Sequence, residues 1–325
     1  MLNEIFSQFP DLNGNEKNDF MKTLLTITLQ FITISLWAQT SIATLNKFIQ
    51  EAKNGSYTTA PQSLFDQEND FNALITELEK YQSDSTARIR SKAYNLSSRF
   101  GQISREETVK QKAIDQQINA LNDEDRGIAG NAIEAMTNFK NIVFTDSQKS
   151  RILNNLSAET PHFNDFVKLI GFLQIKSAIS KLESLLVTKK SAVSRWNIRL
   201  ALARMRDESA IDYISNHLQK APINDAFAYD IVPGLVYTRQ PEIFEFLEVQ
   251  IQSDDANCSV ANPDSNQKIT CAYRIMEALP HSIQNFPIPT DEFGELMVDD
   301  YENALQDLRK WFDENETYGF NNKVY

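Results

Sequence analysis

The chain contains few of the residues on which compact chemical sites usually depend. It has two cysteines, three histidines and nine glycines in 325 residues. A single cysteine pair without a neighbouring histidine cannot supply the four ligands of a structural zinc site. The sequence also lacks a glycine-rich phosphate loop, an HExxH motif and a nucleophile elbow. We therefore predict no metal site, no cofactor and no catalytic residues, although a site assembled from distant helices would leave little linear trace.

Strand signals are scarce as well. Ten prolines and nine glycines are few for this length, and helical apolar stripes are much more frequent than alternating patterns. These features predict an all-α fold. Hydrophobic residues make up 42% of the chain, which suffices for one large domain or two ordinary ones. The net charge of −12 repels phosphate backbones and anionic lipid, so nucleic acid and membrane surfaces are disfavoured as partners.

One helical pattern recurs three times between residues 166 and 251. Its four apolar positions are spaced i, i+1, i+4 and i+8, which places them on one stripe of an α-helix. The three sets, separated by 32 and 33 residues, are Ala178, Ile179, Leu182 and Leu186; Ala210, Ile211, Ile214 and Leu218; and Ile243, Phe244, Leu247 and Ile251. Each set predicts a buried helix face.

A second apolar pattern lies in the helix before each of these, and its three copies are also separated by 32 and 33 residues. Its sets are Phe166, Leu169, Ile170 and Leu173; Ile198, Ala201, Leu202 and Met205; and Ile231, Gly234, Leu235 and Thr238, where the last position is no longer apolar. Two alternating helix types at a fixed period define a two-helix unit, which hides its apolar stripes by stacking on its neighbours.

With residues 206–211 (Arg-Asp-Glu-Ser-Ala-Ile) at the turn and the start of the second helix, the chain resembles the HEAT-like α-solenoid family. This resemblance implies a right-handed α-solenoid of about six antiparallel helix pairs, HEAT/armadillo-like, with a C-terminal capping helix. It carries no information about function.

The repeats are expected over residues 63–292, after a short helix and linker at 39–62. The pattern resumes 44 residues after its last clear copy, at Ile275, Ala278 and Leu279, which makes residues 253–267 an inserted loop. Residues 293–325 are expected to form a cap helix and a tail whose last eight residues are ordered only if their aromatic side chains dock. Pro233 lies inside a predicted helix, where we expect a kink.

The N-terminal region resembles an export signal. An apolar run from Thr23 to Ala38 follows Lys22, and it is too short and too diluted for a comfortable membrane span. We expect a signal peptide at 21–38, translation from Met21, and residues 1–20 to be a mis-assigned or disordered extension. The protein would then be periplasmic or secreted, with no membrane insertion after cleavage. Two features disagree with a signal peptide: Leu36 stands where a small residue is usual before the cleavage site, and the residues before Met21 are acidic rather than basic. The alternative is a buried amphipathic helix.

Cys258 and Cys271 bracket the inserted loop. In an exported protein an isolated pair at this spacing favours a disulfide, which would stabilise the fold by about 3 kcal/mol. The alternative is that Cys271, one turn before Ile275, is simply a small core residue. The acidic and amide side chains of this loop match no calcium-loop spacing, and we expect them to be solvated.

Three arginines are candidates for binding a partner. Arg195, Arg199 and Arg206 fall within about 40° of one another on a helix of 3.6 residues per turn, although Leu202 interrupts the row. Such a row could bind a carboxylate or a phosphate, or it could pair with acids of adjacent helices and hold the stack together. Trp196 and Tyr213 are further candidates for partner contacts, although the neighbours of Trp196 suit a core position.

The resemblance to HEAT-like proteins implies a noncatalytic scaffold or adaptor that binds a protein or peptide, and the N-terminal region adds the expectation of export; the oligomeric state is not predicted. The alternative is a HEAT-like enzyme of the lyase type with a site in a concave groove. Such an enzyme needs a pocket in which a histidine or paired carboxylates meet Tyr213 or Arg199. A smooth groove would favour the scaffold.

Overall fold

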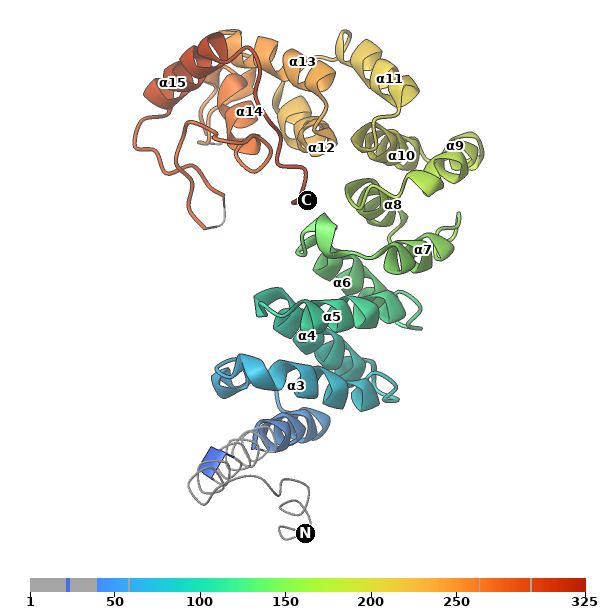
Figure 1. Ribbon diagram of the computed structural model, residues 1–325. Helices are drawn as coiled ribbons and strands as arrows, with labels where there is room; N and C mark the ends of the chain where they lie inside the picture. Colours follow the sequence, from blue (N-terminus) through green and yellow to red (C-terminus); the bar gives the residue numbers. More distant parts are fainter. Residues whose placement is uncertain (1–21, 24–39, 58, 263, 293) are drawn as a thin grey trace, which may run out of the picture. The chain divides into compact units, whose positions relative to one another are not determined.

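The computed structural model describes residues 22–23, 40–57, 59–262, 264–292 and 294–325, and these are predominantly helical (Figure 1). The predicted all-α class is confirmed. The expected extension at 1–20 lies outside the described residues, as does all of the expected signal peptide at 21–38 except residues 22 and 23. No helix within the described ranges combines the length and the apolar character that spanning a bilayer requires.

The chain divides into two compact units, residues 1–112 and 113–325. In the first unit residues 40–53 are helical, and their buried side chains include Leu45, Phe48 and Ile49. The later elements of this unit are the 3-10 turns η1 (Gln62–Leu64), η2 (Glu68–Asp70) and η3 (Glu79–Tyr81), and the helices α3 (Phe71–Leu78) and α4 (Ala87–Ile103). Helix α5 (Glu107–Ala120) contains the division between the units.

The second unit holds the three clearest copies of the sequence pattern, at residues 166–251, and every candidate residue. Its first helices are α6 (Arg126–Thr137) and α7 (Asp146–Asn154), joined by η4 (Asn141–Val143). There follow α8 (Phe163–Phe172), η5 (Lys176–Ala178), α9 (Ile179–Thr188), α10 (Ala192–Arg204), α11 (Glu208–Leu218), η6 (Phe227–Ile231), α12 (Val232–Thr238), α13 (Pro241–Gln252), β1 (Cys258–Ser259), β2 (Lys268–Ile269), α14 (Ala272–Ala278) and α15 (Tyr301–Glu314).

The predicted stripes account for most of the core of this unit. In α8, α10, α11 and α13 every stripe position is buried, whereas Ile179 and Leu186 of α9 are half-buried and Leu185 takes an inner place instead. Helix α10 packs against both α8 and α12, and α11 packs against α13. Thr238 is fully buried despite its hydroxyl, because that hydroxyl donates to the Leu235 carbonyl 2.6 Å away.

The first-type helices share one way of ending. Gln174, Arg206 and Arg239, which follow α8, α10 and α12 at the same repeat position, all adopt positive φ, at 55°, 65° and 55°. At α10 the Arg206 N–H donates to the Ala203 carbonyl and the next N–H to the Leu202 carbonyl, a Schellman motif. The repeat register therefore includes a left-handed residue after each of these helices, although none of the three is glycine.

Pro233 produces a change of helix type. The preceding residues form the π-helical turn η6, and Pro233 lies in the first turn of α12, where its missing N–H is not needed. The kink that we expected inside one helix is thus a junction between a π-turn and an α-helix.

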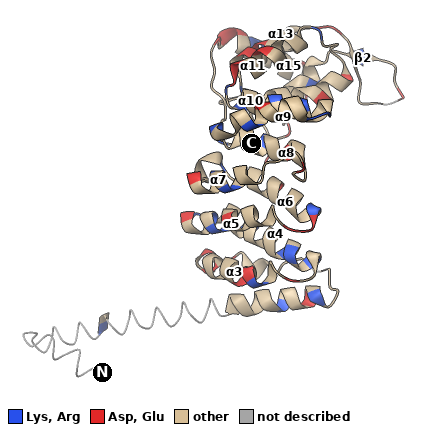
Figure 2. Cartoon of the chain, turned by 90° about the vertical axis from the view of Figure 1, so that its right-hand side faces the viewer, with Lys and Arg blue, Asp and Glu red and all other residues tan. Residues whose placement is uncertain are grey.

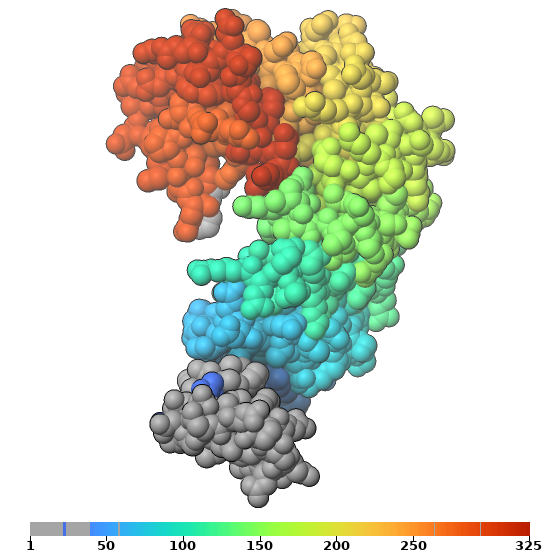
Figure 3. Space-filling view, viewed as in Figure 1, coloured from blue at the N-terminus to red at the C-terminus, as the bar shows by residue number. Residues whose placement is uncertain are grey.

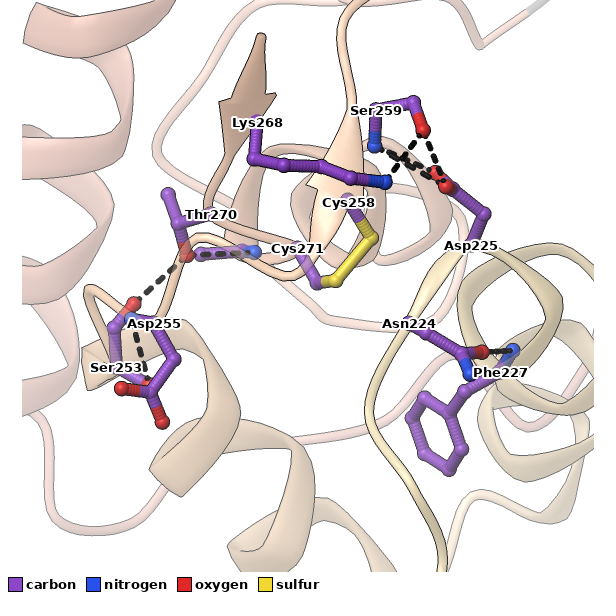
Figure 4. Close-up of a disulfide and its surroundings, with 11 residues drawn as sticks. Asn224, Asp225, Phe227, Ser253, Asp255, Cys258, Ser259, Lys268, Thr270 and Cys271 are labelled. Carbon is purple, nitrogen blue, oxygen red and sulfur yellow. Dashed lines mark hydrogen bonds between the residues drawn. A yellow bond between two sulfur atoms is a disulfide. The ribbon is translucent and has the colours of Figure 1, made fainter. Parts of the chain in front are cut away.

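A small hairpin that the sequence did not predict begins in the inserted loop and ends just after it. Strands β1 and β2 pair antiparallel, with Cys258 opposite Ile269, and a disulfide joins Cys258 to Cys271 with the sulfur atoms 2.05 Å apart (Figure 4). Asp225 accepts hydrogen bonds from the backbone N–H and the hydroxyl of Ser259. The predicted disulfide is present, and both cysteines are also buried. Such bonds persist mainly in oxidising compartments.

Candidate functional site

The arginine row does not form as predicted. Arg195 and Arg199 lie on α10, but this helix ends at Arg204. Arg206 has left-handed backbone geometry and an exposed side chain, so it does not continue the helical face. The prediction of three aligned cations was wrong for Arg206, because Arg206 is itself the left-handed residue of the Schellman turn that ends the helix.

The remaining two arginines contact neutral groups. Arg195 donates to the backbone carbonyls of Lys189 and Lys190, at 2.9 and 2.7 Å. The Arg199 guanidinium carbon lies 3.6 Å from the centre of the Tyr213 ring, a cation–π contact. No ion pair within the described ranges involves Arg195, Arg199 or Arg206, so these arginines do not hold neighbouring helices together by pairing with acids. Trp196 is half-buried beside them.

A histidine does meet these residues, but on an open surface. The His217 ring stacks on Tyr213 with centroids 3.9 Å apart, and its Nδ1 lies 2.8 Å from the Tyr213 carbonyl oxygen. His217 is exposed. A cavity of about 720 Å³ in the same unit is lined by other residues. The enzyme hypothesis needs a histidine beside Tyr213 or Arg199 and a pocket at the same place. The histidine beside Tyr213 and the cavity are instead at different places.

The second unit binds its own C-terminal tail, residues 318–325, which contains no helix and makes a turn at residues 322–323 (Figure 1). The tail begins in an aromatic cluster in which the Phe320 ring lies 4.6 Å from Phe244, and Tyr318 packs on Trp311 and Phe312. The Tyr318 hydroxyl donates to Glu248, and burial raises the pKa of both groups. In the space-filling view the last residues, in dark red, reach the green residues near position 140 (Figure 3).

Most carbonyl groups of the tail accept hydrogen bonds from the repeats. Those of Gly319 and Phe320 accept from Gln284, that of Lys323 from the backbone N–H of Asn141, and that of Asn322 from the Asn141 side chain. Arg204 donates to the Val324 carbonyl at 3.1 Å, and Arg239 to the main-chain oxygen of Tyr325 at 3.2 Å. The side chains of residues 322–324 are exposed. The repeats thus bind the tail mainly through its backbone.

The tail lies along one position of the repeat. Phe172, Arg204 and Tyr237 are separated by 32 and 33 residues, the same offsets that relate the apolar stripes. The Tyr325 ring packs against Phe172 and Tyr237, at 5.5 Å between centroids in each case, and Arg204 binds the backbone between them. After the 44-residue interval the same position is His281, whose carbonyl accepts from the Asn321 amide. We call these four residues the inner row.

Arg204 and Arg239 are the buried charges of this surface. They are 2% and 4% exposed, and no ion pair among the described residues includes either one. Burial lowers the pKa of Arg204 to about 10 and that of Arg239 to about 9, and for Arg239 the nearby Arg204 charge adds to the effect. Their hydrogen bonds go to carbonyls at helix ends and in the tail, which offset part of the cost of burying the charges.

The sequence contains one signal for these residues that the stripe analysis passed over. Arg204 lies inside the apolar run from Leu200 to Met205. A charged side chain is unusual in such a run, because its neighbours face the core. Arg204 also shares the offset of 32 with Phe172. Arg204 stands out when residues at equivalent positions of successive repeats are compared. It does not stand out when charges on one face of a single helix are compared.

Charges elsewhere on the second unit are dispersed. Figure 2 shows acidic and basic positions interspersed along the helices. No group of three or more histidine, cysteine or acidic side chains within the described ranges is placed to hold a metal ion.

No protein-family model matches the chain, and no curated protein matches it either. The resemblance to HEAT-like repeats therefore stays a hypothesis based on the register of apolar positions.

Proposed function

We propose that the protein is an exported, noncatalytic scaffold of the right-handed HEAT-like α-solenoid type that binds an extended segment of a partner protein along the inner row. The observation that supports this most directly is the way in which the tail is bound. Any extended peptide presents backbone carbonyls that can accept these hydrogen bonds, so the same surface suits a segment of another protein. The tail would then occupy the place of that segment.

Export to the periplasm or the outside of the cell, with a signal peptide at 21–38, is part of this proposal. The buried disulfide supports it, because thiols are kept reduced in most cytosols. The lyase-type alternative has less support, since the His217 cluster and the 720 Å³ cavity are separate.

The proposal is tested by letting the tail bind in trans. A protease site placed at residues 315–317, which precede the tail, allows the full chain to be folded first and cut afterwards. We expect a labelled synthetic peptide of residues 318–325 to rebind the cut protein with a micromolar dissociation constant, measured by fluorescence anisotropy. A peptide with alanine at the exposed positions 322–324 should bind within about threefold of the original, because its carbonyls are unchanged.

A matched pair of variants controls for the arginines. Arg204→Met should weaken peptide binding at least about tenfold, because a charged donor to the peptide carbonyls is lost. Arg195→Met, on the same helix but without a tail contact, should leave it unchanged. Failure of the peptide to rebind a cut protein whose circular dichroism is unaltered would sink the proposal.

A further inference from the structure

Two tyrosines anchor the tail, Tyr318 at its start and Tyr325 seven residues later. Tyr318 is half-buried in the aromatic cluster that the tail forms with α13 and α15. The Tyr325 ring packs against two rings of the inner row. The side chains of residues 322–324, between the anchors, are exposed. Selectivity for the side chains of a bound segment is therefore expected at the anchors rather than at these exposed positions.

The first anchor is held by its hydroxyl as well as by its ring. The Tyr318 hydroxyl donates to the carboxylate of Glu248 on α13. Glu248 is half-buried, and no ion pair among the described residues includes it. Burial raises the pKa of this carboxyl, whereas the hydrogen bond from Tyr318 opposes the rise. Phenylalanine would fill the same space as the tyrosine ring, but it would leave the half-buried carboxylate without this donor.

The second anchor is held through its ring. The planes of the Tyr325 and Phe172 rings stand at 84°, an edge-to-face arrangement, and those of Tyr325 and Tyr237 at 54°. Such ring pairs contribute beyond the apolar area that they bury. An aliphatic side chain at this position would keep part of the burial and lose both ring pairs. Phenylalanine would keep both.

We infer that the surface that holds the tail selects partner segments with tyrosine at the first anchor and an aromatic residue seven positions later. Glu248 is the residue that distinguishes tyrosine from phenylalanine at the first anchor. The second anchor accepts either one, because its contacts are between rings. This inference rests on the proposed function, since it takes the tail as a stand-in for the partner segment.

The experiment uses competition for the cut protein. Unlabelled, acetylated peptides of residues 318–325 displace the labelled one, and acetylation removes an amino-terminal charge that Glu248 would otherwise attract. We expect Tyr318→Phe in the peptide to weaken binding at least about tenfold, because a hydrogen bond to a charged group is lost. Tyr325→Leu should weaken it about fivefold, and Tyr325→Phe should leave it within about twofold.

A matched pair of protein variants assigns the tyrosine preference to one side chain. Glu248→Met removes the acceptor and keeps a side chain of similar length, so the tyrosine and phenylalanine peptides should bind alike. Glu245→Met removes an exposed acid of the same helix and should keep the preference. A preference that survives in a folded Glu248→Met protein would overturn the inference.

The same titrations separate this inference from the proposed function. Equal binding of the tyrosine and phenylalanine peptides to the unmodified cut protein would overturn the selectivity and leave the proposed function standing. Rebinding by none of the peptides would overturn both.

Discussion

Two pairs of arginines in the same unit have opposite roles. Arg195 and Arg199 are partly exposed on α10 and contact nearby carbonyls or a tyrosine ring. Arg204 and Arg239 are buried at helix ends and reach residues 324 and 325, more than 80 positions away in the chain. A search for charged faces finds the first pair, because alignment on a helix is a local property. The second pair connects the repeat to the tail, and this contact becomes visible only in the fold.

The largest expected effect separates the two pairs directly. Arg204→Ala removes a large, fully buried side chain and leaves the carbonyls of Tyr237 and Val324 without their donor. We expect the free energy of unfolding to fall by about 3 kcal/mol. Arg195→Ala, measured by the same urea titration, should lower it by less than about 1 kcal/mol. Equal losses of unfolding free energy in the two variants would mean that the buried arginine contributes no more to stability than the partly exposed one.

The aromatic end of the tail should give the next largest effect. Tyr325→Ala removes the ring that packs against Phe172 and Tyr237, and we expect a loss of about 2 kcal/mol together with faster amide exchange in residues 321–325. Val324→Ala, next to it and exposed to a similar degree, is the control and should change stability by less than about 0.5 kcal/mol. Unchanged exchange in the Tyr325 variant would contradict an anchoring role.

The helices could be predicted because their stripes are local. The i, i+1, i+4, i+8 spacing needs only helical geometry, and it placed Ile214 and Leu247 in the core correctly. Helix ends were less predictable: the left-handed turn at Arg206 is made without glycine, so composition gave no sign of it.

The candidate site was the least predictable part. The disulfide could be inferred, because only one pairing of two cysteines is possible. Docking of the tail on Arg204 and Arg239 brings together segments that neither periodicity nor composition relates. The inner row did obey the repeat offsets, but it combines an aromatic ring, a cation and a second aromatic ring, so hydropathy alone conceals it.

Alkaline pH provides a third way to probe the inner row, through Tyr237. Burial, and then the nearby Tyr325, raises the pKa of Tyr237 well above its ordinary value. The folded state therefore keeps this proton after the unfolded chain has lost it. The resulting contribution to stability is complete below pH 10 and falls by about 1.4 kcal/mol per pH unit above it.

Tyr237→Phe tests this contribution. The variant loses the hydrogen bond to the Lys168 carbonyl at every pH, which should cost about 1 kcal/mol. Between pH 9 and pH 11, however, its free energy of unfolding should fall by about 1.4 kcal/mol less than that of the unmodified protein. Urea titrations at the two pH values measure both terms. Parallel pH profiles would show that the Tyr237 phenol titrates alike in the folded and unfolded states.

The smallest expected effect belongs to Arg199, one of the three arginines that the sequence indicated as candidates for binding a partner. Arg199→Ala removes a cation–π contact with Tyr213 on a partly exposed surface, and such contacts contribute about 0.5 to 1 kcal/mol. Arg199→Lys keeps a cation but not the planar guanidinium, and it should recover part of the loss. Peptide rebinding to the cut chain should be unchanged in both variants, because neither touches the tail. A rebinding defect in Arg199→Ala without loss of stability would instead place a partner on the exposed pair, as the sequence first indicated, and would reverse the roles of the two sets of arginines.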